Sequence, residues 1–126
     1  GGVALLEVYN DFISSDHQAE VDSDAEVGRH IVIEALKAPV KQIAENAGKT
    51  GEVIIADIQR ANKDGYGYDA LHDCYTNVIE DGIIDPVKVT KNALLNATSI
   101  ASMLLTAEAA IVKKPEKQQP TIPPIM

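Results

Sequence analysis

The sequence contains no tryptophan, one phenylalanine and a single cysteine, Cys74. Aromatic residues make up only 4% of its 126 residues, so aliphatic side chains must fill most of the core, which favours packed helices. One cysteine excludes an internal disulfide and is typical of a reducing compartment. Because a free cysteine usually behaves as a small apolar residue, we predict that Cys74 lies in the core and is not a nucleophile.

No apolar run approaches the roughly 18 residues that a membrane span needs, and the amino end lacks the basic-then-apolar pattern of a signal peptide. These absences predict a cytoplasmic protein or a resident of an organelle matrix. Positive charge is also scarce: 11 Lys and Arg residues stand against 19 Asp and Glu residues, which gives a formal net charge of -8. Because such a surface repels phosphate backbones and anionic lipid headgroups, we expect neither nucleic acid nor membranes as partners.

Motifs for metal or phosphate chemistry are lacking too. His17, His30 and His72 are scattered along the chain, and their spacing predicts no metal site. The segment 48–51 (GKTG) lacks the upstream glycine and strand of a phosphate-binding loop, so we interpret it as a turn between helices. These motifs give no candidate catalytic residue.

The pattern that is present is helical. Apolar spacing predicts a first helix over residues 3–13, and a capping box formed by Ser23 and Glu26 predicts the start of a second, after a polar loop over residues 14–24. Pro39 must kink or break the second helix, which continues to Gly48. A third helix is predicted over residues 52–61. The apolar side chains expected to face the core are Leu5, Val8, Tyr9, Phe12, Ile31, Ala35, Leu36, Val40, Ile43, Ala44, Ala47, Val53, Ile54 and Ile58.

Beyond residue 61 the periodicity changes. A turn cluster at residues 62–65, followed by tyrosines and other β-favouring residues, predicts a short hairpin. Asp85 at an N-cap position and Pro86 at the first helical position predict a last helix that ends near Thr106. We therefore predict a mainly α fold of about four packed helices, one kinked at Pro39, with a small β-hairpin. Residues 107–112 are expected to form a terminal strand, and residues 113–126, with four of the six prolines, a mobile tail.

Asp85 and Asp69 each have a local structural explanation. Asp85 is explained as a helix cap, yet the oxygen left over by capping can accept a hydrogen bond from a ribose hydroxyl. Asp69 is explained equally well as a residue of the hairpin. From the residues alone the sequence predicts an acidic helical domain and no function.

Four segments resemble, in the same order and spacing, sequences of the group I chaperonins, the GroEL type. They are residues 1–6 (GGVALL), 34–43 (EALKAPVKQI), 65–70 (GYGYDA) and 81–90 (DGIIDPVKVT). The resemblance implies that residues 1–112 are the C-terminal part of the ATP-binding equatorial domain of such a protein. The opening, apolar at once and without an initiator Met, is likewise expected of a cut inside a longer chain.

The resemblance also implies a nucleotide site. Gly1 matches a glycine whose backbone approaches the nucleotide, and Asp85 matches the carboxylate that holds the ribose hydroxyls. Asp69, Ala70 and Leu71 match a stretch that lies against the adenine, with Asp69 and Leu71 in place of the usual Asn and Ala. Ile83 matches an apolar residue beside the base.

Family resemblance further implies ATP with Mg²⁺ as the cofactor of the full-length parent. The other chaperonin subunits of a homo-oligomeric ring are implied as partners, and residues 107–112 are expected to pair with a neighbouring subunit. Unfolded polypeptides and a co-chaperonin would bind through domains outside this chain. Because the catalytic and metal-binding residues of these ATPases lie elsewhere, we expect no ATP hydrolysis by this chain alone, and no cofactor is firmly expected on it.

Two alternatives remain open. The chain could be a stand-alone acidic helical interaction module, derived from a chaperonin and without ATPase activity. A small enzyme that uses Asp69 or Asp85 as an acid or base is the other.

Overall fold

A computed structural model of the chain describes residues 1–15, 23–107 and 113–115. The chain divides into two compact units, Gly1–Asp85 and Pro86–Met126, and each is described by itself. No helix within the described ranges is long and apolar enough to cross a membrane.

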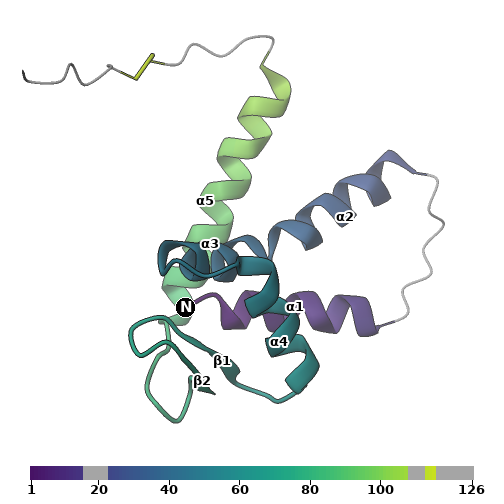
Figure 1. Cartoon of the computed structure of the whole chain (residues 1–126). Coiled ribbons are helices and arrows are strands. Elements are labelled where there is room, and N and C mark those ends of the chain that lie inside the picture. Colours follow the sequence, from purple (N-terminus) through teal and green to yellow (C-terminus); the bar gives the residue numbers. More distant parts are fainter. Residues whose placement is uncertain (16–22, 108–112, 116–126) are drawn as a thin grey trace, which may run out of the picture. The chain divides into compact units, whose positions relative to one another are not determined.

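The first unit contains helices and one hairpin (Figure 1). The elements in chain order are α1 (Val3–Ser14), α2 (Asp24–Ala35), α3 (Ala38–Asn46), α4 (Gly51–Ala61), β1 (Tyr66–Asp69) and β2 (Cys74–Asn77). The predicted mainly helical fold with a small hairpin is therefore confirmed. Of the predicted loop over residues 14–24, Ser14 belongs to α1 and Asp24 to α2, while residues 16–22 lie outside the described residues.

The boundary between α2 and α3 follows the sequence signals. At the start of α2, the Ser23 hydroxyl accepts a hydrogen bond from the Glu26 backbone N–H at 3.2 Å. The helix ends at Ala35, and α3 begins at Ala38 with Pro39 in its first turn, where the missing N–H costs no helical hydrogen bond. The predicted interruption is therefore a break between two helices, and Pro39 lies in the first turn of the second helix.

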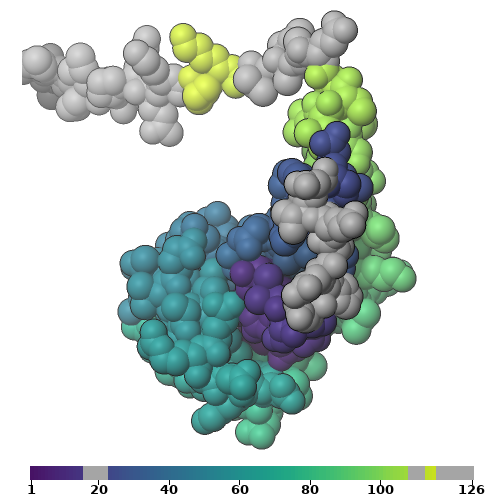
Figure 2. All heavy atoms as spheres, turned by 90° about the vertical axis from the view of Figure 1, so that its right-hand side faces the viewer, coloured from purple at the N-terminus to yellow at the C-terminus, as the bar shows by residue number. Residues whose placement is uncertain are grey.

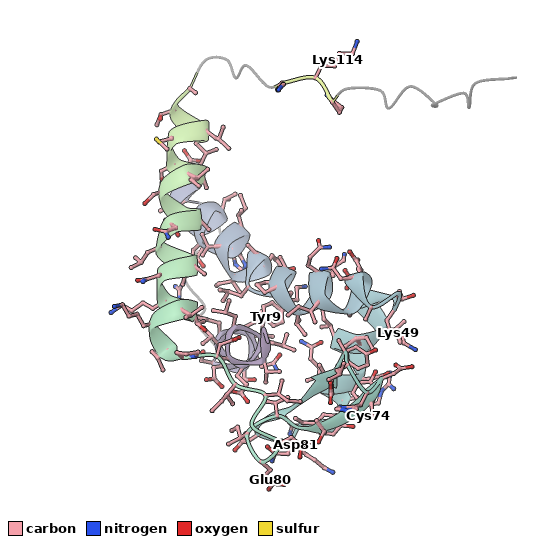
Figure 3. All side chains as sticks on the ribbon, turned by 90° about the vertical axis from the view of Figure 1, so that its left-hand side faces the viewer. Tyr9, Lys49, Cys74, Glu80, Asp81 and Lys114 are labelled. Carbon is pink, nitrogen blue, oxygen red and sulfur yellow. The ribbon has the colours of Figure 1, made fainter. Side chains whose placement is uncertain are left out.

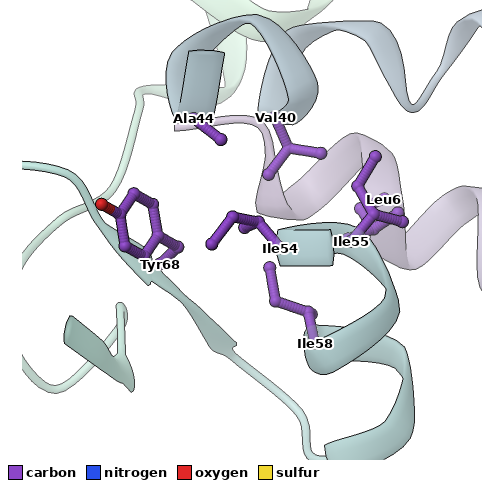
Figure 4. Close-up of a cluster of buried hydrophobic side chains, with 7 residues drawn as sticks. All are labelled: Leu6, Val40, Ala44, Ile54, Ile55, Ile58 and Tyr68. Carbon is purple, nitrogen blue, oxygen red and sulfur yellow. The ribbon is translucent and has the colours of Figure 1, made fainter. Parts of the chain in front are cut away.

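The core of this unit forms where α3 packs on α4. Ala44 of α3 is fully buried, and the small side chain lets the two helices approach closely. Figure 4 shows Tyr68 of β1 directed into the same cluster from the hairpin side. The space-filling view shows α1 (purple) packed beside these elements (Figure 2). The cluster consists of Leu6, Val40, Ala44, Ile54, Ile55, Ile58 and Tyr68.

Several predicted core positions were wrong. Ile31 is 65% exposed and Val53 is 54% exposed, and in α4 the buried residue beside Ile54 is Ile55. In α1 the buried residues are Val3 and Leu6. Of the predicted face, Tyr9 is partly buried and packs against the core, whereas Val8 and Phe12 are exposed. The reason is that α1 and α4 carry apolar residues on more than one face, so spacing alone cannot decide which face is covered. The other predicted core positions that are exposed are Ala35 and Ala47.

The hairpin is antiparallel, with Tyr68 opposite Tyr75 and Asp69 opposite Cys74. The Tyr75 hydroxyl donates to Asp57 Oδ2 of α4 at 2.6 Å, and burial followed by this hydrogen bond raises the pKa of Tyr75 to about 12. Cys74 is exposed, so the prediction that it lies in the core was wrong. Because successive side chains of a strand point to opposite faces, a Tyr75 directed at α4 turns Cys74 away from it.

The second unit is described from Pro86 to Ala107 and from Lys113 to Pro115. Its helix α5 (Val87–Thr106) confirms the predicted helix, but none of its residues is buried. Residues 113–115 have no regular structure, and the predicted terminal strand and most of the predicted mobile tail lie outside the described residues. Large apolar side chains that α5 exposes are Val87, Val89, Leu94, Leu95, Ile100, Met103, Leu104 and Leu105.

Replacement of neighbouring apolar residues tests the corrected face of α4. Ile54→Ala removes a side chain that is 6% exposed and should lower the free energy of unfolding by about 2–5 kcal/mol, because it leaves a cavity in the core. Val53→Ala, at an exposed position, should cost less than about 1 kcal/mol. Urea unfolding followed by far-ultraviolet circular dichroism measures both, and equal losses would contradict this packing.

Candidate functional site

The residues that the sequence singles out lie at two places, one beside α3 and the other beside the segment that follows it. One is the junction of the chain start with Asp85, beside Ile43. The other is the turn of residues 70–73 between β1 and β2, beside Lys49.

The first place is built by two glycines. Gly2 has a φ of +82°, and a Cβ built on it would lie 2.7 Å from the backbone nitrogen of Val40. Only glycine allows this conformation and this approach of the chain start to α3. A Cβ built on Gly1 would lie 3.0 Å from Ile43 Cδ1 and 3.3 Å from Asp85 Oδ2. The Asp85 carboxylate therefore lies directly beside the main chain of Gly1.

Asp85 does not cap a helix, and that prediction was wrong. Helix α5 begins at Val87, its N-cap residue is Pro86, and no side chain makes a capping hydrogen bond there. The proline takes an extended conformation (φ -57°, ψ 137°), which moves the helix start one residue beyond the predicted position. The Asp85 side chain is exposed, and neither of its oxygens is used for capping.

The segment that leads to Asp85 is held by the backbone of the hairpin. The Val78 N–H donates to Gly65 O, and the Ile83 N–H donates to Val78 O, both at 2.8 Å. Ile83 is half-buried, whereas its neighbour Ile84 is 63% exposed. These bonds fix the position of Ile83, two residues before Asp85.

At the second place, the Asp69 carboxylate is buried and points into its own turn. Its Oδ1 accepts from the Leu71 N–H at 2.9 Å and from the His72 N–H at 3.3 Å, and its Oδ2 lies 2.6 Å from His72 Nδ1. The hydrogen bond from the His72 side chain lowers the pKa of the Asp69 carboxyl, against the opposing effect of burial, and the two backbone bonds lower it further. Asp69 therefore shapes the turn from inside.

A second carboxylate holds the same turn to Lys49, which follows α3. Asp73 has a φ of +52°, and its two oxygens accept from Lys49 Nζ at 2.7 Å and from the Tyr68 hydroxyl at 2.8 Å. The hydrogen bond from Lys49, followed by that from Tyr68, lowers the pKa of Asp73. Figure 3 shows Lys49 just beyond α3, on the same side as Cys74, which follows Asp73. The turn is thus fastened at both of its ends.

The structure brings Gly1 and Asp85 together and places Ala70 and Leu71 on the turn, where Ala70 is half-buried and Leu71 is 84% exposed. Sequence reasoning missed His72, Asp73 and Lys49. An aspartate that accepts hydrogen bonds from residues two and three positions on is a known turn pattern, so the spacing of Asp69 and His72 could have indicated their contact.

Two other features were tested against this arrangement. Among the described residues, no three His, Cys, Asp or Glu side chains gather as metal ligands. A groove of about 300 Å³ lies between α1 and the turn before β1, lined in part by Glu7, Asn10 and Asp64. None of the site residues predicted from the sequence lines this groove.

Comparison with known protein families shows which family the chain is similar to. The family model described as the TCP-1/cpn60 chaperonin family matches residues 1–115, which covers both places and all of α5.

The two turn carboxylates predict the acid stability of the protein. The pKa of Asp69 and that of Asp73 are lowered by folding, so their stabilisation is present above the unfolded-state pKa of about 4 and is lost as pH falls below it. Asp69→Asn and Asp73→Asn should each lower stability at neutral pH and flatten its fall between about pH 5 and pH 2. Urea unfolding across this range measures the slope. The exposed Asp64→Asn serves as control, and an equal flattening in it would contradict the assignment.

Proposed function

Because the chain belongs to the TCP-1/cpn60 chaperonin family, we propose that it supplies the adenine and ribose side of the nucleotide site of a group I chaperonin. In this role it is the C-terminal part of an equatorial domain. The assembled protein uses ATP to assist the folding of unfolded polypeptides in a ring-shaped cage.

The observation that carries this proposal is the position of Asp85 beside Gly1. An exposed carboxylate that caps no helix has two oxygens that can accept hydrogen bonds from a ribose diol. The neighbouring residue is a glycine, and a Cβ there would stand 3.3 Å from the carboxylate oxygen. A ligand can therefore approach both the carboxylate and the Gly1 main chain.

The base end of the site is apolar. Ala70 and Leu71 on the turn and Ile83 in the following segment offer aliphatic surface, which suits the face of a purine. Asp69 contributes in a different way from the expected direct contact. Since both of its oxygens accept hydrogen bonds from its own turn, we propose that it positions Ala70 and Leu71.

Phosphoryl transfer needs groups that position Mg²⁺, the γ-phosphate and the attacking water. The family resemblance implies that these groups lie in other parts of a chaperonin subunit. We therefore propose that Asp85, Gly1 and the turn bind and orient the nucleoside, and that this chain alone hydrolyses no ATP.

The proposed partners are other subunits of the same ring. Support comes from α5, whose 20 residues include none that is buried and several large apolar side chains that are more than half exposed. A monomeric protein rarely leaves so much apolar surface in water, so other chaperonin segments are expected to cover the helix. We place this assembly in the cytoplasm or an organelle matrix.

The proposed role of the Asp85 carboxylate can be tested with a nucleotide that lacks the ribose hydroxyl groups. Asp85→Ala should weaken ADP binding by about tenfold or more, because hydrogen bonds to a charged group are lost. Isothermal titration calorimetry on the protein as its gene encodes it measures this affinity. With 2′,3′-dideoxy-ADP, which has no ribose hydroxyls, the variant and the unaltered protein should bind equally.

Asp64→Ala, which removes an exposed carboxylate far along the chain from the junction, is the matched control and should leave ADP binding unchanged. If the unaltered protein binds no ADP, the nucleotide role fails and the stand-alone acidic interaction module is favoured. If Asp85→Ala weakens ADP and dideoxy-ADP to the same extent, Asp85 does not hold the ribose.

A further inference from the structure

The turn between β1 and β2 exposes two side chains while its backbone is held from inside. Leu71 is 84% exposed, and the side chain of His72 is 71% exposed. The side chain of Asp69, which bonds to both residues, is only 10% exposed. A ligand that lies against the turn would contact both of these side chains.

The contact with Asp69 fixes the tautomer of His72. An ionised carboxylate has only acceptor sites, so a nitrogen 2.6 Å from Asp69 Oδ2 must donate its proton. The lowered pKa of Asp69 keeps the carboxylate ionised at neutral pH. Nδ1 therefore carries the hydrogen, and in the neutral imidazole Nε2 is left with a free lone pair.

The imidazole is also restricted in direction. Its inner nitrogen is held by a buried group, while most of the ring is open to solvent. The two backbone bonds to Asp69 Oδ1 hold residues 71 and 72 in the same turn, and Asp73 fastens the next residue to Lys49 and Tyr68. His72 thus presents one hydrogen-bond acceptor from a preorganised turn, at little cost in conformational entropy.

We propose that His72 is a specificity residue for the base: its Nε2 accepts a hydrogen bond from the exocyclic 6-amino group of adenine. This inference rests on the proposed nucleotide site, in which the same turn lies against the base. It adds a residue that the family resemblance did not assign, and it gives Asp69 the role of a positioning residue that acts through the imidazole.

The chemistry distinguishes the purines. Adenine carries an amino donor at position 6, whereas guanine and hypoxanthine carry a carbonyl acceptor there. An acceptor on His72 attracts the amino group and repels the carbonyl oxygen. Because His72 is largely exposed, the discrimination should be about tenfold, the value of one ordinary hydrogen bond, and not the much larger ratio of a closed pocket.

The test compares ADP with inosine diphosphate (IDP) by calorimetry on the protein as its gene encodes it. The unaltered protein should bind ADP about tenfold more tightly than IDP. His72→Phe keeps a flat ring but has no acceptor, so it should bind the two nucleotides equally. Leu71→Ala is the matched control on the same turn: it should weaken both nucleotides and leave their ratio unchanged.

Asp69→Asn tests the role of His72 through the ratio of ADP to IDP affinity. A purely structural role of His72 predicts no change in this ratio. An asparagine amide can donate to His72 Nδ1, which transfers the ring proton to Nε2 and turns the acceptor into a donor. The preference should then shift from ADP toward IDP.

Each result decides the proposal. Equal binding of ADP and IDP by the unaltered protein, or an unchanged ADP preference in His72→Phe, overturns the role of His72 but leaves the nucleotide site standing. A full ADP preference in Asp69→Asn overturns the tautomer assignment. If neither ADP nor IDP binds, the nucleotide site and this inference are overturned together.

Discussion

The burial of Val40 and Ala44 on α3 is the constraint on which the first unit depends. These side chains fix α3 against α4, and Leu6 and Tyr68 bring α1 and the hairpin to the same cluster. Other residues of α3, and those just beyond it, can then contact the segments that carry the proposed site. Ile43 lies beside Gly1, and Lys49 reaches Asp73. Helix α3 and the segment that follows it thus each hold one end of the proposed site in place.

Three aspartates show how environment divides one residue type among different tasks. Asp69 is buried and turned inward by backbone N–H groups and an imidazole. Asp73 adopts a left-handed conformation that Lys49 and Tyr68 stabilise. Asp85 stays exposed beside a glycine. In the proposed site, two of these aspartates serve the ribose and the base, which are the uncharged parts of the nucleotide.

Local signals in the sequence predicted the elements better than the contacts. The capping box at Ser23 and the break at Pro39 depend on neighbours along the chain, so their physics is visible in the sequence. The burial of Ile55 instead of Val53 depends on where α3 lies, and no spacing rule contains that information. The same holds for Asp85, whose position beside Gly1 joins residues 84 positions apart in the sequence. The cap that its neighbours in the sequence predicted for Asp85 does not form, because Pro86 takes an extended conformation and is itself the N-cap residue.

The position of Asp85 at the end of the first unit links the proposed site to assembly. Only Pro86 separates it from α5 along the chain. Helix α5 buries none of its own residues, and whatever covers its apolar side chains therefore also restrains the direction in which the chain leaves Asp85. A carboxylate that must hold two hydroxyl groups at fixed angles is sensitive to such a restraint. Nucleotide affinity and the covering of α5 are for this reason expected to be thermodynamically linked.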